Sequence, residues 1–164
     1  MRGRLARLAS ELAADRSTIA KLGQDTKSCA SSITPTTTDP AALALLAVDI
    51  HRWYTGLETA LERVERTFGS LPSGGDWHFE LLCGAALDIA GVRPPILPAA
   101  VIGPLREVLR FRHFFRHAYA VELDAQRLLS VAAFLVATHQ AVDAALAAFS
   151  DFVARAAAAL DELI

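Results

Sequence analysis

Cysteines and long apolar runs are scarce in this chain of 164 residues. Its two cysteines, Cys29 and Cys83, match no metal-binding or redox spacing, which predicts free thiols in a reducing compartment. The longest apolar run, Leu128 to Ala137, is far shorter than the roughly 20 residues of a membrane span. No apolar signal-peptide core follows the basic N-terminus. We therefore expect a soluble cytoplasmic protein with no membrane part.

The chain also lacks a strong net charge. Its formal charge is −2 at pH 7, so the protein as a whole is not an electrostatic nucleic-acid binder, and any such function needs a local basic patch. Apolar residues make up 53% and charged residues 21%, a globular balance without a large disordered part. The length fits a single domain with a sizeable core.

No segment alternates apolar and polar residues as a strand does, and the apolar spacing is helical throughout. We predict a first helix over residues 1–23, a flexible Ser- and Thr-rich linker over 24–38, and a core bundle over 39–164. Asp39 as N-cap and Pro40 at the first helical position open a long helix. The other helices are expected over residues 39–68, 76–90, 100–118 and from Asp124 almost to residue 164. The predicted fold is all-α, an up-and-down bundle of four to five helices.

The fourth of these helices contains the stretch FRHFFRHAY, residues 111–119. At about 100° per residue it carries two neighbouring polar stripes, and the phenylalanines should face the bundle. The stripes are Arg106, Arg110, His113 and His117, and beside them Arg112, Arg116 and Tyr119. The nearest acidic residues in sequence are Glu107 and Glu122, too few to neutralise this charge.

A solvated basic face is the plainest interpretation of such a helix. The residue types favour a phosphate site instead. Arginine offers a two-pronged contact to phosphate, and a histidine titrating near neutral pH can move a proton. With a tyrosine to orient or donate, this set suits RNA cleavage in which the ribose 2′-hydroxyl attacks its own phosphate. That reaction needs neither a covalent protein nucleophile nor a metal.

The spacing from Arg112 to Tyr119 reads R-x4-H-x-Y, which resembles the signature of HEPN-domain ribonuclease toxins of the HepT type. The resemblance extends from about residue 40 to residue 164. It includes Tyr54 and Glu58 on the long helix, the turn Gly74-Gly75-Asp76-Trp77-His78, Arg93-Pro94, and the approach from Leu109 to His113.

This resemblance implies a metal-independent endoribonuclease, the toxin of a bacterial toxin–antitoxin pair, with no cofactor. Catalysis falls to Arg112, His117 and Tyr119, and we expect His113, Arg116 and Arg110 to bind RNA phosphate. The implied partner is a nucleotidyltransferase antitoxin of the MNT class. It can transfer AMP to Tyr119, which would block the site by AMPylation. The resemblance also implies a homodimer with one cleft between the subunits.

The helix geometry makes a dimer physically sensible. Arg112 and His117 are five residues apart, so on a straight helix they diverge by about 140° and are separated by about 7.5 Å along the axis. Either a kink near the motif or a two-fold axis pairing Arg112 of one chain with His117 of the other would bring them to one phosphate. The bundle is expected to dimerise through the motif helix.

Other interpretations remain open at this stage. His113 and His117 could share a metal across one helical turn, although no third ligand is evident. His78 is expected to pack beside Trp77 at a helix start rather than to assist at an RNA cleft. Tyr54 is expected in the core, and Glu58 can pair with a motif arginine. The alternative function is a non-catalytic HEPN module that binds nucleotide or RNA, or serves a nucleotidyltransferase as an accessory subunit.

Overall fold

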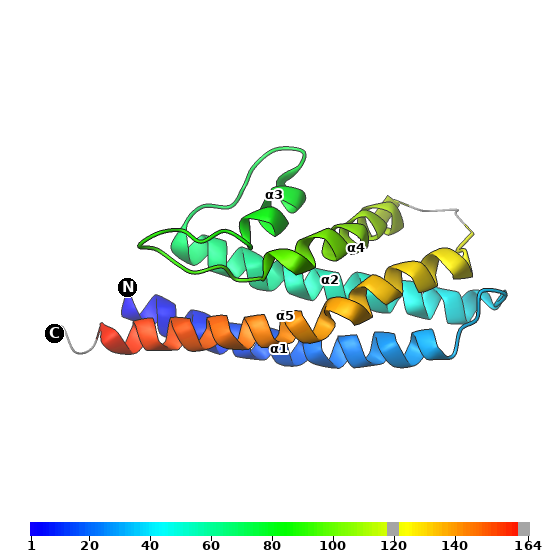
Figure 1. Ribbon diagram of the computed structural model, residues 1–164, viewed down its shortest axis with the longest axis horizontal. Helices are drawn as coiled ribbons and strands as arrows, with labels where there is room; N and C mark the ends of the chain where they lie inside the picture. The colour runs from blue at the N-terminus through cyan, green and yellow to red at the C-terminus, as the bar shows by residue number, and fades with distance from the viewer. Residues whose placement is uncertain (118–121, 161–164) are drawn as a thin grey trace.

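The helices of the protein form an up-and-down bundle, as expected from the sequence (Figure 1). The structure is a computed structural model, and it describes residues 1–117 and 122–160. Over these residues it contains five helices and no extended strand: α1 Arg2–Ser31, α2 Pro40–Phe68, α3 Trp77–Gly84, α4 Ala99–His117 and α5 Ala125–Ala159. Helices α1 and α4 run one way and α2 and α5 the other, while short α3 lies beside α2 and α4.

Helix α1 is longer than predicted, and the boundary expected at Gly23 is wrong. The helix continues to Ser31, so most of the residues assigned to a flexible linker are helical. A Cβ atom at Gly23 would lie 2.3 Å from Cε1 of His139 on α5. This glycine therefore permits close packing of two helices and does not end one. The buried Thr26 continues the packed face beyond it.

Helices α2 and α5 begin where the sequence predicts. The Asp39 side chain accepts a hydrogen bond from the Ala41 amide at 3.0 Å, and Pro40 occupies the first turn. Asp124 caps α5 by accepting from the Arg127 amide at 2.7 Å. Each cap satisfies an amide that lacks a partner within its helix. The last predicted residues of α5, 161–164, lie outside the described part of the chain.

Helix α3 ends at Gly84, earlier than the predicted residue 90. The cause is Arg93, whose guanidinium is buried and donates to the carbonyl oxygens of Gly84 at 3.2 Å and Leu87 at 3.1 Å. It also donates to Glu65 on α2 at 2.5 Å. These bonds replace the next helical turn with a compact turn that leads into α4.

Helix α5 is long and apolar enough to cross a membrane by length and composition alone. One face of it is buried against α1, α2 and α4, through residues such as Leu135, Val142 and Phe149. Arg16 on α1 donates from Nε and Nη2 to the two carboxylate oxygens of Asp143 on α5, at 2.8 and 2.9 Å. These contacts join one face of α5 to the rest of the bundle.

Candidate functional site

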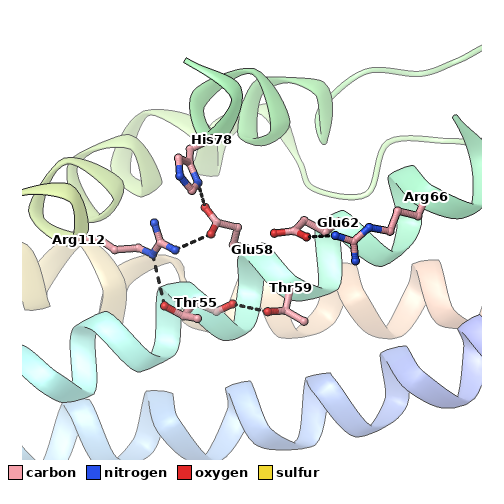
Figure 2. A network of polar contacts seen from close by, with 7 residues as sticks. All are labelled: Thr55, Glu58, Thr59, Glu62, Arg66, His78 and Arg112. Atoms are coloured by element: carbon pink, nitrogen blue, oxygen red, sulfur yellow. Dashed lines mark hydrogen bonds and ion pairs between the residues drawn. The ribbon is translucent and has the colours of Figure 1, made fainter. Parts of the chain in front are cut away.

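Glu58 on α2 joins two residues that are distant from it in sequence (Figure 2). Arg112 on α4 donates from Nη2 to Glu58 Oε1 at 2.6 Å. His78 on α3 lies with Nδ1 2.6 Å from Glu58 Oε2. Arg112 Nε also donates to the Thr55 hydroxyl, one turn earlier on α2, at 3.3 Å. The expected pairing of Glu58 with a motif arginine is therefore confirmed.

This network is buried. The Glu58 and Arg112 side chains are each only 6% exposed. Because charges out of water are stable only when paired and hydrogen-bonded, Arg112 and Glu58 depend on each other. One donor of Arg112, Nη1, is buried and makes no hydrogen bond within the part of the chain that the structure describes. The orientation of Arg112 is therefore fixed by its contacts, and its Nη1 could still donate a hydrogen bond to a ligand.

The ring of Tyr54 on α2 packs against the Arg112 guanidinium. Its ring centroid lies 6.0 Å from the Arg112 guanidinium carbon, and the residue is 1% exposed. Burial, followed by the nearby Glu58 charge, raises the pKa of Tyr54 well above its usual range. Tyr54 is thus a neutral core residue, as predicted, that presents an aromatic face to the guanidinium.

His78 contacts more than the predicted packing partner. It stacks on Trp77 with ring centroids 3.6 Å apart, and the ring of His113 on α4 meets it edge-on at 4.8 Å. Burial, followed by the neighbouring His78 ring and the Arg112 charge, lowers the pKa of His113, and Glu58 opposes this change. The expectation that His78 only packs at a helix start is therefore incomplete, since it also binds the carboxylate that holds Arg112.

The other motif residues are nearer the surface. Arg110 is exposed and donates to Glu107 at 2.7 Å, so two motif arginines have acidic partners. Arg116 and His117 are exposed in the last turn of α4. Tyr119, predicted as a catalytic residue and as the modification target, lies outside the described residues.

The phenylalanines of the motif pack inward, as predicted. Phe111 is buried and stacks on the partly buried Phe115 at 5.8 Å, while Phe114 is partly buried under Arg127 at 4.5 Å. Their burial against α2 and α5 fixes the rotation of α4. That rotation turns Arg112 toward α2.

Arg112 and His117 are not brought together within one chain. Helix α4 is continuous through His117, without a break after Arg112, so the two side chains diverge by about 140°. Arg112 faces α2 and is buried, whereas His117 is exposed. The described part of α4 is therefore not interrupted between Arg112 and His117.

His51 is a residue near the motif that the sequence analysis missed. It lies one turn before Thr55 on α2, and its ring is 5.7 Å from that of Phe115. Burial and then the charges of Arg112 and Arg116 lower its pKa. The spacing of His51, Thr55 and Glu58 at i, i+4 and i+7 on one helix face was the signal that could have identified it.

Two hollows lie away from this network. One of about 690 Å³ lies between the start of α2 with the loop before it and residues 122–125, and another of about 590 Å³ lies between α1 and α5 around His139. Among the described residues no group of three His, Cys, Asp or Glu side chains could hold a metal. Among the described residues, the motif forms a packed cluster with exposed arginine and histidine side chains at its surface.

Comparison with known families gives one match. A family model described as HepT-like protein matches residues 45–153, which includes Glu58, His78, Arg112 and His117. The matched region begins within α2, so α1 lies outside it. Searches of curated proteins and of solved structures found no match.

Proposed function

This chain belongs to the HepT-like protein family, and from that premise we propose that it is the toxin of a bacterial toxin–antitoxin pair and acts as a metal-independent endoribonuclease. The observation that carries the proposal is the state of Arg112. It is held in one orientation by Glu58 and Thr55, with Nη1 still unpaired among the described residues, inside an intact R-x4-H spacing. A guanidinium oriented in this way is suited to a phosphate oxygen.

The proposed roles follow from exposure and chemistry. Arg110 and Arg116, both exposed, make the first contacts with the RNA backbone, together with His113. Arg112 then binds the scissile phosphate through Nη1 after the side chains that cover it rearrange. His117 acts as general acid or base, and Tyr119 assists.

A second copy of the chain completes this site in the proposal. Because Arg112 and His117 diverge on one continuous helix, a two-fold axis beside α4 would bring His117 of one subunit to Arg112 of the other. The active species is then a homodimer with two equivalent sites.

The proposed partner is an MNT-class nucleotidyltransferase antitoxin that transfers AMP to Tyr119. AMP would add a bulky anion three residues after Arg116 in the sequence, and this anion would compete with RNA phosphate for the same donors. Cleavage of RNA is then expected only from protein whose intact mass shows no AMP.

The experiment is cleavage of total bacterial RNA by the unmodified protein, with and without a chelator. We expect cleavage that EDTA does not inhibit and that both Arg112→Ala and His117→Ala abolish. A Lys27→Ala variant, which removes an exposed charge on α1, serves as the matched control and should cleave normally. An unmodified, folded wild type that leaves RNA intact would contradict the proposal.

One observation favours the alternative, a non-catalytic module that binds RNA or serves the nucleotidyltransferase. Arg112 is only 5% exposed in the single chain, which is also what a purely structural ion pair would show. This function predicts RNA binding or antitoxin binding without cleavage. A binding assay with the same RNA, run beside the cleavage assay, separates the two functions.

A further inference from the structure

His78, which lies outside the motif, is hydrogen-bonded to the Glu58 carboxylate that also binds Arg112. We infer that His78 is a second acid–base residue, the general base that accepts the proton of the RNA 2′-hydroxyl. The inference rests on the proposed ribonuclease function and assigns a residue that lies outside the R-x4-H-x-Y motif. It comes from the arrangement of Glu58, which binds His78 through one oxygen and Arg112 through the other.

The Glu58 contact prepares His78 for proton transfer. A carboxylate 2.6 Å from Nδ1 favours the tautomer that has its hydrogen on Nδ1, so the lone pair lies on Nε2. The same carboxylate stabilises the imidazolium once Nε2 accepts a proton. Stacking on Trp77 at 3.6 Å holds the plane of the ring. A ring with a fixed tautomer and a fixed plane is what general base catalysis requires.

The Glu58 contact also places His78 beside the proposed phosphate position. Arg112 Nη2 and His78 Nδ1 are each 2.6 Å from their own oxygen of one carboxylate, so they are at most about 8 Å apart. Figure 2 shows both side chains meeting at Glu58. In this proposal, Nη1 of Arg112 binds the phosphate and Nε2 of His78 in the same chain faces the attacking 2′-hydroxyl. His117 of that chain points elsewhere on α4.

The two histidines then take complementary roles. Nε2 of His78 removes the proton from the 2′-hydroxyl, and the 2′ oxygen forms a bond to phosphorus. The bond from phosphorus to the 5′ oxygen breaks, and the imidazolium of His117 from the second subunit gives its proton to that oxygen. The products are a 2′,3′-cyclic phosphate and a 5′-hydroxyl, and Arg112 neutralises the phosphate throughout.

A purely structural role for His78 predicts different behaviour. In that case the Glu58 bond and the Trp77 stack would only fasten α3 to α2, and replacing His78 would lower stability without altering the chemistry. The charged and titratable groups that face His78 are Glu58 on α2 and Arg112 and His113 on α4, and all three remain in a His78 variant. A change in the pH dependence of cleavage can thus be assigned to His78 itself.

The test measures kcat, KM and the pH–rate profile of His78→Gln on a short RNA. His139→Gln is the matched control, because His139 is also a half-buried, hydrogen-bonded imidazole but lies on α5 against Trp53. We expect kcat of His78→Gln to fall by at least about 100-fold with little change in KM, and the limb of the pH profile due to the base to disappear. His139→Gln should retain both. A His78→Gln protein with normal kcat and an unchanged profile would overturn the inference.

A second substrate separates base from acid. With sulfur in place of the bridging 5′ oxygen, the leaving thiolate needs no proton, so His117→Ala should regain cleavage and His78→Gln should not. Recovery of His78→Gln on this substrate would show that His78 is not the base.

A measurement on the wild type covers the case in which His78→Gln does not fold. In protein labelled with ¹⁵N-histidine, the Nε2 resonance of His78 should shift when 2′-fluoro RNA binds, and no shift would contradict the inference. If the wild type fails to cleave RNA, the proposed function fails and the role of His78 with it. If the wild type is active and His78→Gln is too, only the role of His78 fails.

Discussion

At the residue scale, the burial of an ion pair decides how much that pair contributes to stability. Glu58 is the clearest case, since its carboxylate is the counterion of Arg112 and the acceptor for His78. Glu107 makes a chemically similar pair with Arg110. This pair lies at the surface, where the Arg110 side chain is 61% exposed. The two pairs should therefore contribute very differently to stability.

Glu58→Ala should lower the free energy of unfolding by about 3–5 kcal/mol, because Arg112 stays buried without its counterion. Glu107→Ala should change it by less than about 1 kcal/mol. Urea denaturation followed by circular dichroism measures both. A loss below about 1 kcal/mol for Glu58→Ala would mean that Arg112 relaxes to solvent, contrary to the buried network.

Three half-buried or surface-lying histidines give the stability a predictable pH dependence. Burial is the main cause that lowers the pKa values of His51, His113 and His139 below the ordinary value of 6.5. The unfolded chain then binds more protons than the folded chain just below pH 6.5, so stability falls as pH falls through that value.

We therefore expect Tm to decrease between about pH 7.5 and pH 5.5, and to decrease less in His139→Gln. Differential scanning fluorimetry in buffers of equal ionic strength measures this change. A Tm that is constant, or that rises, over the same interval would contradict the direction of these pKa shifts.

At the scale of the helices, the contact between α1 and α5 explains why α1 does not end at Gly23, where the sequence predicts its end. Gly23 allows His139 to lie directly against the α1 backbone, and Trp53 on α2 donates its indole hydrogen to Nδ1 of His139 at 3.2 Å. Three helices thus meet at one imidazole.

Gly23→Ala should destabilise the protein by about 1–3 kcal/mol, because the added Cβ overlaps the His139 ring and that ring is held by Trp53. In the His139→Ala background the same substitution should cost far less, which a double-mutant cycle measures. Gly103→Ala on α4 is the control: its Cβ meets no described atom within 4 Å, so it should be neutral or slightly stabilising. Equal costs for Gly23→Ala in both backgrounds would show that the close contact is not the cause.

At the scale of the whole molecule, the single chain contains an oriented arginine and an exposed histidine on different sides of one helix. Because the net charge is −2, the RNA affinity of the proposed function would have to come from the local arginines of α4. A symmetric dimer through this helix would concentrate two such sets of arginines and complete each site.

Subunit mixing tests this arrangement. A heterodimer of Arg112→Ala and His117→Ala subunits has one site that lacks both residues and one site that is intact if the residues act across the interface. Co-expressed at equal amounts, the two inactive variants should therefore recover about a quarter of the wild-type cleavage rate. Each variant alone is the control and should stay inactive. No recovery in a verified heterodimer would place both residues in one chain.

The sequence by itself determined the features that depend on neighbours along the chain. Asp39 and Asp124 cap their helices, and the apolar stripe of α2 is buried from Leu43 to Val64, because caps and helical periodicity are local interactions. The all-α class and the R-x4-H spacing are properties of the same kind.

Tertiary structure alone decided the features that depend on residues far apart in the chain. Arg93 ends α3 through carbonyl bonds, Gly23 marks a helix contact and not a helix end, and His51 lies beside the motif. The sequence indicates Glu58 as a partner of a motif arginine, but it does not indicate the simultaneous contact of Glu58 with His78. These contacts arise from the rotation and packing of whole helices, which are set by the sum of many buried side chains and not by any local pattern.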